Sequence, residues 1–284
     1  MHVASAAGIA FARFCALDRR PRGGVYVGVS GTISGGTLAT VGAGAAINVQ
    51  LAGNVFSGVT IAAGSLVEVV AGGSLTLSGT TSNAGTIIAS GASSFIDIAS
   101  AGIVSGGVVE VGNGVVDVLS GGKANIAFVT NDSGGLEIAD SAGHVSAFAG
   151  TVSGFGGSSH NNPNQHIDLT SVTSAGTIAV SYTSASGNKS GTLDVLSNST
   201  LVAAIQMIGA YSAGNFHVTA GQGGAVEITD PAVVAGGGSV QSANLALFGN
   251  YIAGSFVTAG GWQGGTSIAA APASEHILAA PHGG

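Results

Sequence analysis

Charged residues and cysteine are scarce in this 284-residue chain, which has 6 Lys+Arg, 13 Asp+Glu and one cysteine, Cys15. A single cysteine cannot form an intrachain disulfide or a Cys-x-x-Cys metal or redox motif. Residues 23–284 hold two basic side chains against twelve acidic ones, so they lack the basic stripe that neutralises nucleic-acid phosphates. We therefore expect no nucleic-acid partner and no binding to anionic membrane surfaces.

Long hydrophobic runs and proline are also scarce. No uninterrupted run of eighteen apolar residues occurs, which predicts that the chain has no transmembrane segment. Five prolines are too few for collagen, and the composition of a coiled coil is missing. Residues 1–22 hold four of the six basic residues and do not form a regular export signal, so we place them outside the fold as a non-core segment.

Glycine and small apolar residues are abundant instead. The chain contains 50 glycines, is 45% hydrophobic and has a mean hydropathy of +0.53. That hydrophobicity excludes a disordered polar linker. Short apolar stretches separated by Gly, Ser, Thr and Asn are typical of strands joined by turns, so we predict an all-β protein.

The first half of the chain repeats itself. Three apolar-acid-apolar triplets, centred on Asp97, Asp117 and Glu137, are each displaced by twenty residues, and two more are centred on Glu68 and Glu110. Such alternation is typical of half-buried strands, and the glycine pairs between them favour tight turns. A period near twenty predicts a right-handed parallel β-solenoid (β-helix) over residues 23–150. A β-sandwich, the alternative, would not require a strict twenty-residue return.

The repeat units resemble those of a known family. Segments such as Thr32–Leu38 and Ser105–Val111 are similar to the S-G-G-x-φ-x-φ passenger repeats of AIDA-type autotransporter adhesins, over residues ~31–150. The resemblance implies a Gram-negative exported β-solenoid that adheres to host cells, glycans or abiotic surfaces, or associates with itself. The chain lacks the C-terminal outer-membrane domain of that family, so we expect either a fragment or another export route.

The second half differs in character. Residues 158–165 form a polar stretch, predicted to be a loop with a turn at Pro163. A β-rich module is predicted over residues 151–231, with strands near 166–169, 177–182, 192–196, 201–208, 215–219 and 225–228. The pattern φ-G-x-Y-x-A-G-x-F occurs at residues 208–216 and again at 248–256. Residues 232–284 are therefore predicted to hold a second, partial copy of a forty-residue unit and a tail.

This second half also resembles a known module. Its two φ-G-x-Y-x-A-G-x-F copies and the ending Glu275–His282 are similar to the C-terminal module of secreted and surface repeat proteins of alphaproteobacteria. The resemblance implies a secreted or surface-bound protein and assigns no chemistry to any residue.

The acidic triplets provide the main candidate site. If the coil period holds, Asp97, Asp117 and Glu137 stack on one outward face about 5 Å apart. Three interpretations stay open: a solvated acidic face, a calcium site built from carboxylate oxygens, or the carboxylates of a polysaccharide hydrolase. A lyase would also need a cationic group, for which Lys123 is the nearby candidate.

Two further groups of residues are candidates. His160, His166 and Asp168 could hold a transition metal, although a solvated polar loop that runs into a strand is the favoured explanation. Trp262, Tyr211 and Tyr251 are candidate contact residues, although for the two tyrosines a place in the core is the favoured interpretation.

The sequence contains no catalytic motif, so we predict no catalytic residue, no enzyme activity and no cofactor apart from calcium. The predicted function is a non-enzymatic, adhesin-like repeat protein located outside the cell or on a bacterial cell surface. One alternative is a β-helix polysaccharide hydrolase or lyase that uses Asp97, Asp117 and Glu137. Another is a secretion or interaction module of a larger exported protein.

Overall fold

The computed structural model describes residues 25–27, 31–139, 148–158, 160–230, 256–260 and 266–270. The chain divides into two compact units, Met1–Ala232 and Val233–Gly284, which are treated separately below. The described regular elements are strands, apart from two three-residue 3-10 turns, η1 (Ala213–Asn215) and η2 (Gln222–Gly224). Within this described part, no helix has the length and apolar character needed to cross a membrane.

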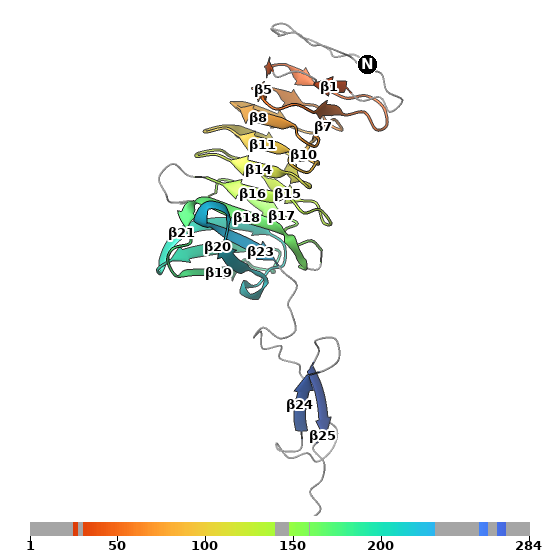
Figure 1. Ribbon diagram of the computed structural model, residues 1–284. Helices are drawn as coiled ribbons and strands as arrows, with labels where there is room; N and C mark the ends of the chain where they lie inside the picture. The colour runs from red at the N-terminus through yellow and green to blue at the C-terminus, as the bar shows by residue number, and fades with distance from the viewer. Residues whose placement is uncertain are drawn as a thin grey trace, which may run out of the picture. The chain divides into compact units, whose positions relative to one another are not determined.

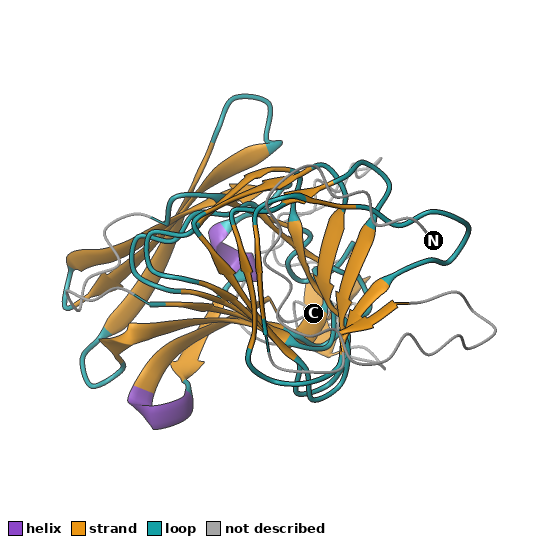
Figure 2. Cartoon of the chain, turned by 90° about the horizontal axis from the view of Figure 1, so that it is seen from above, coloured by secondary structure: helices purple, strands orange, loops and turns teal. Residues whose placement is uncertain are grey.

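The first unit contains a parallel β-solenoid of about five turns (Figure 1). This confirms the predicted all-β class and the stacked parallel coils. Each early coil contributes one strand to each of three sheets, and the later coils contribute to two. Seen from above, the coils lie over one another and the strands form the walls (Figure 2).

The strands of the three sheets follow one another in space as follows. The ten-stranded sheet runs β1 (Val25–Val27), β4 (Ile47–Val49), β7 (Leu66–Val69), β10 (Thr86–Ala89), β13 (Val109–Val111), β15 (Ile126–Phe128), β17 (Thr151–Ser153), β21 (Thr200–Ile208), β20 (Ser190–Ser197) and β19 (Ile178–Ser184). The nine-stranded sheet runs β2 (Thr32–Ser34), β5 (Asn54–Ser57), β8 (Ser74–Ser78), β11 (Phe95–Ile98), β14 (Val115–Val118), β16 (Gly135–Ile138), β18 (Asn162–Thr173), β23 (Ala225–Asp230) and β22 (His217–Ala220). The four-stranded sheet runs β12 (Ile103–Gly106), β9 (Thr80–Asn83), β6 (Thr60–Ile61) and β3 (Thr37–Leu38).

The core is a set of inward ladders in which each coil adds one apolar side chain to the last. In the nine-stranded sheet one such ladder, fully buried, consists of Leu75, Ile96, Val116, Leu136 and Ile167. Burying a side chain of this size stabilises the fold by about 1.5–3 kcal/mol. Neighbouring residues on a strand point to opposite faces. On each strand, the residue next to the ladder member therefore points outward.

The parallel stack ends in a cap of antiparallel strands. β18 is the last parallel strand of the nine-stranded sheet, and β23 pairs with it in the antiparallel sense. In the ten-stranded sheet β19, β20 and β21 form an antiparallel meander beyond β17. The core becomes aromatic here, where Phe155 contacts Phe128 with ring centroids 5.0 Å apart and Phe216 with centroids 6.5 Å apart.

One sequence prediction in the cap is wrong over half of its range. Residues 158–165 were predicted to form a loop with a turn at Pro163; residues 158, 160 and 161 lie outside any strand, but β18 begins at Asn162 and includes Pro163. The physical reason is Gln165, which is fully buried: its side chain accepts a hydrogen bond from the Gly156 N–H and donates one to the Val129 carbonyl. A polar residue is tolerated in a buried strand when its hydrogen bonds are satisfied.

The second unit contains a two-stranded hairpin, β24 (Phe256–Gly260) and β25 (Thr266–Ala270). It pairs in the same relation as the cap hairpin formed by β22 and β23. The corresponding pairs are Val218↔Ile228 with Val257↔Ala269, and Thr219↔Glu227 with Thr258↔Ile268. The Val-Thr-Ala stretch that follows each φ-G-x-Y-x-A-G-x-F pattern thus pairs with equivalent positions of the following strand in both copies.

Candidate functional site

The three predicted acidic residues lie side by side on the nine-stranded sheet. Asp97 on β11 is opposite Asp117 on β14, which is opposite Glu137 on β16. Each is half-buried and lies between two buried apolar neighbours on its strand, so all three side chains face outward. Neighbouring strands are about 4.8 Å apart, which makes this a row of closely spaced carboxylates.

The row continues into the cap through two residues that the sequence analysis did not assign to it: Asp168, which was predicted only as a possible metal ligand with His160 and His166, and Glu227, which was not singled out. Asp168 on β18 is opposite Glu137, and Glu227 on the antiparallel strand β23 is opposite Asp168. Their signal was present, since both are the centre of an apolar-acid-apolar triplet. It was overlooked because Asp168 follows Glu137 by thirty-one residues rather than twenty, and because Glu227 reaches the row from a strand of opposite direction. Asp97, Asp117, Glu137, Asp168 and Glu227 are called the carboxylate row below.

Burial and mutual repulsion raise the pKa values of several members of the row. Burial, with smaller contributions from Glu137 and Asp97, raises the pKa of Asp117 to about 6. The pKa of Asp168 is also raised to about 6: burial is the main cause, His166 opposes it, and Glu227 and Glu137 make smaller contributions that raise the pKa. The pKa of Asp97 is raised by burial and lowered in part by its hydrogen bond from Thr76.

Hydrogen bonds reach the ends of the row. Thr76 Oγ1 donates to Asp97 Oδ2 at 3.3 Å, and Thr219 Oγ1 donates to Glu227 Oε1 at 3.0 Å. In the interior of the row, Asp117 Oδ1 and Asp168 Oδ1 are buried and have no hydrogen-bond partner. A buried acceptor without a partner is costly, so the protein's own hydrogen bonds compensate the charge of these two carboxylates only in part.

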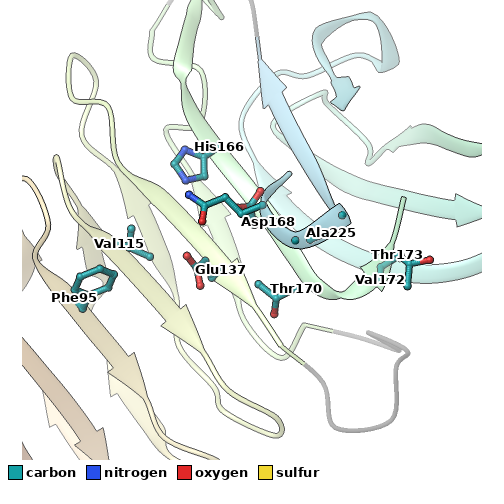
Figure 3. A pocket seen from close by; sticks show the side chains of 12 residues that line it. Phe95, Val115, Glu137, His166, Asp168, Thr170, Val172, Thr173 and Ala225 are labelled. Carbon is teal, nitrogen blue, oxygen red and sulfur yellow. The ribbon is translucent and has the colours of Figure 1, made fainter. Parts of the chain in front are cut away.

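A groove of about 550 Å³ crosses the cap end of this face (Figure 3). The row contributes Glu137 and Asp168 to it, and η2 forms part of its wall. The His166 imidazole lies over Gly135 on the neighbouring strand, where a β-carbon would collide with the ring. Glycine at this position therefore gives the imidazole its place beside the groove.

The residues that line the groove differ in polarity from one end of the groove to the other. An apolar part contains Phe95, which is 42% exposed, and Val115. A polar part contains Thr170, Thr173 and Gln222. The carboxylates lie among these neutral groups, which is an arrangement suited to a ligand with both charged and uncharged polar atoms.

The predicted metal sites are not assembled as closed clusters. Among residues 31–139, 148–158 and 160–230, no three His, Cys, Asp or Glu side chains lie close enough together to hold a metal ion. The carboxylates are arranged in a line, one per strand. Calcium at Asp97, Asp117 and Glu137 therefore stays a prediction.

The structure separates the residues of the second metal prediction. His166 and Asp168 are on one strand and line the groove, but His160 is engaged elsewhere. Its Nδ1 lies 2.7 Å from Oδ2 of Asp230, which is fully buried, and its ring packs edge-on against Tyr211 with centroids 4.6 Å apart. His160 therefore contacts the end of β23 and does not lie with His166 and Asp168.

Of the three predicted contact residues, Tyr211 is the one that the structure describes, and it is buried. Tyr211 is 4% exposed, and its hydroxyl donates to the Phe155 carbonyl at 3.0 Å. It also stacks on Phe216 with centroids 5.5 Å apart, so it occupies the core position that the sequence analysis favoured for it. Tyr251 and Trp262 lie outside the described residues, as do residues 1–22 and the tail 275–282.

The fold and this site define the class of the protein: a parallel β-solenoid with an antiparallel cap and an outward row of carboxylates that leads into a groove. Comparison with known proteins adds no family to this description, because no protein-family model, curated protein or solved structure matches the chain. The function is therefore argued from the geometry of the chain itself.

Proposed function

We propose that this protein is a non-enzymatic, adhesin-like repeat protein that works outside the cell or on a bacterial cell surface. The observation that supports the proposal is the carboxylate row. Three consecutive coils and the two following strands place a carboxylate at the same outward position. A solenoid that repeats one outward chemistry is suited to a partner that is itself extended, such as a host cell, a glycan, an abiotic surface or another copy.

Repetition makes such a face effective in adhesion. An individual solvent-exposed charge contact contributes about 0–1 kcal/mol, but several contacts on one rigid scaffold engage a repeating surface together, and their combined affinity exceeds each one. Asp117 and Asp168 each have a buried carboxylate oxygen without a hydrogen-bond partner, so a cationic group on the partner would offset part of their uncompensated charge. Export itself is supported by the resemblance of the repeats to autotransporter passengers.

The proposal is tested in two steps. Native cells and medium are fractionated, and intact cells are treated with protease before probing with antibody; protein in the medium or removed by protease supports surface exposure. Purified protein is then assayed for binding to host cells, glycans and abiotic surfaces. A triple variant, Asp97→Asn, Asp117→Asn and Glu137→Gln, should lose most of the binding.

A matched control exists on the ten-stranded sheet. Glu68 and Glu110 also face outward, but Ile88 lies between them in the register, so they form no row. The variant Glu68→Gln, Glu110→Gln removes carboxylates without touching the row and should bind normally. Equal loss in both variants, or a protein confined to a protected cytoplasmic fraction, would overturn the proposal.

A polysaccharide hydrolase is the second candidate, because Glu137 and Asp168 are strand neighbours at one groove. Asp168, with its pKa raised to about 6, would protonate the leaving oxygen, and the Glu137 carboxylate would act as nucleophile or base. This candidate predicts new reducing ends from a polysaccharide incubated with the protein. Their formation should stop in both Asp168→Asn and Glu137→Gln.

A further inference from the structure

The groove at the cap end is lined by a carboxylate whose charge the protein compensates poorly. Asp168 lines the groove (Figure 3) and is 7% exposed. Its Oδ1 is buried, has no hydrogen-bond partner, and would lie 3.2 Å from a β-carbon at Gly221. A cationic group in the groove, next to this carboxylate, would offset the cost of its burial.

The charge around this atom defines the sign of that ligand. Glu137 and Glu227 are the strand neighbours of Asp168 on either side. His166 is the one basic side chain among the residues that line the groove. Three carboxylates beside one imidazole favour a cationic group, and a cation at this position would also relieve the mutual repulsion of the row.

The rest of the lining indicates what the cation is attached to. Thr170, Thr173 and Gln222 offer neutral hydroxyl and amide groups, which pair with hydroxyls. At the other end of the groove the exposed ring of Phe95 offers an apolar surface. Phe95 and Asp168 are three strands apart, or about 14 Å, so the occupant is extended.

We infer that the groove binds an amino sugar, a glycan unit with a free amino group, whose ammonium contacts Asp168 and Glu137. The sugar hydroxyls face Thr170, Thr173 and Gln222, and the apolar face of a neighbouring ring packs against Phe95. This inference names the ligand class of the binding protein proposed above and rests on that proposal.

An ammonium group matches the site better than a calcium ion does. Calcium requires six to eight oxygen ligands around it, whereas an ammonium carries three N–H donors. Two carboxylates and a nearby hydroxyl provide enough acceptors for those donors. The lysine side chain of a peptide also carries an ammonium but brings no row of hydroxyls for the neutral part of the groove, so it serves as a comparison in the test.

The experiment titrates the full chain with a short oligomer of glucosamine and with its N-acetylated counterpart, by calorimetry. The two probes differ in whether the nitrogen is charged. We expect binding of the first and at least about tenfold weaker binding of the second, because a charge-assisted hydrogen bond is lost. Asp168→Asn and Glu137→Gln should each weaken binding of the glucosamine oligomer by about tenfold, and Glu110→Gln should leave it unchanged.

Phe95→Ala keeps the carboxylates intact and should weaken binding of the oligomer more than that of glucosamine alone, so the inference can be tested even where a charge variant folds poorly. Equal affinity for both oligomers, preference for a lysine peptide, or displacement of the sugar by calcium would overturn the inference. None of these results would overturn the proposed adhesive function if surface binding still depends on Asp97 and Asp117. Conversely, if the protein binds the glucosamine oligomer but is confined to the cytoplasm, the proposed function is overturned and the inference about the groove's ligand is retained.

Discussion

Asp117 lies directly opposite Glu137 on the neighbouring parallel strand, and both carboxylates face outward. Two like charges at this spacing repel each other, and the row continues on either side of them. The solenoid tolerates this because the inward ladder beneath, in which Val116 pairs with Leu136, fixes the register. The outward residues therefore take the positions that the core imposes.

The first prediction concerns pH. Asp117 and Asp168 have pKa values near 3.8 in an unfolded chain and about 6 in the fold. Between these values the folded state binds more protons than the unfolded state, so the free energy of unfolding falls as the pH rises. This contribution is fully present below about pH 4 and lost above about pH 6. Urea denaturation at pH 4.5 and 7.5 should differ by about 2 kcal/mol after allowance for solvent screening.

The second prediction isolates one member of the row. Asp117→Asn keeps the shape of the side chain, removes a half-buried charge and gives Glu137 an amide donor. At pH 7.5 the free energy of unfolding should rise by about 1 kcal/mol, and at pH 4.5 it should change little. Asp194→Asn, on the outward side of β20 away from the row, is the control. A destabilised Asp117→Asn protein at pH 7.5 would contradict the repulsion described here.

The third prediction tests the inward ladder. Leu136 is fully buried between Val116 and Ile167, so Leu136→Ala leaves a cavity that neighbouring coils cannot fill. Its free energy of unfolding should fall by about 2–5 kcal/mol. Leu201→Ala removes the same atoms from a side chain that is 52% exposed and should change little. Similar losses in both variants, measured by chemical denaturation, would argue against a tightly packed solenoid core.

The fourth prediction concerns the contact between His160 and Asp230 in the cap. His160→Ala removes the imidazole that lies 2.7 Å from the fully buried Asp230 and leaves Asn215 as its remaining side-chain partner, so the free energy of unfolding should fall by about 1–3 kcal/mol. Asp230→Asn alone should cost less, because the amide is cheaper to bury than a carboxylate. A double-mutant cycle over the two positions measures the coupling directly. Strictly additive losses would mean that the pair contributes nothing to holding β23.

The sequence was sufficient for the solenoid because its signal is local and repeated. A twenty-residue return of apolar-acid-apolar triplets defines both the inward ladder and the outward position of Asp97, Asp117 and Glu137. The place of Asp168 and Glu227 in the row was not predicted, because the chain makes a longer excursion before β18 and reverses direction before β23. Repetition is a strong signal only while the interval between copies stays constant.

Contacts between distant segments of the cap could not be predicted. His160 meets Asp230 seventy residues further along the chain, and Tyr211 reaches back to the carbonyl of Phe155. Both depend on how antiparallel strands fold over the last coil, and no local pattern encodes that arrangement. Gln165 illustrates the same point, since only its two backbone partners make its burial in a strand favourable.

The constant outward position of the carboxylates has a consequence for length. Each coil of the solenoid contacts chiefly the coils next to it, so a whole coil can be gained or lost without disturbing the pairing of the others. Each such step would extend or shorten the row by one carboxylate and about 4.8 Å. The reach of this protein is therefore a modular quantity, adjustable in units of about twenty residues while the cap and its groove stay as they are.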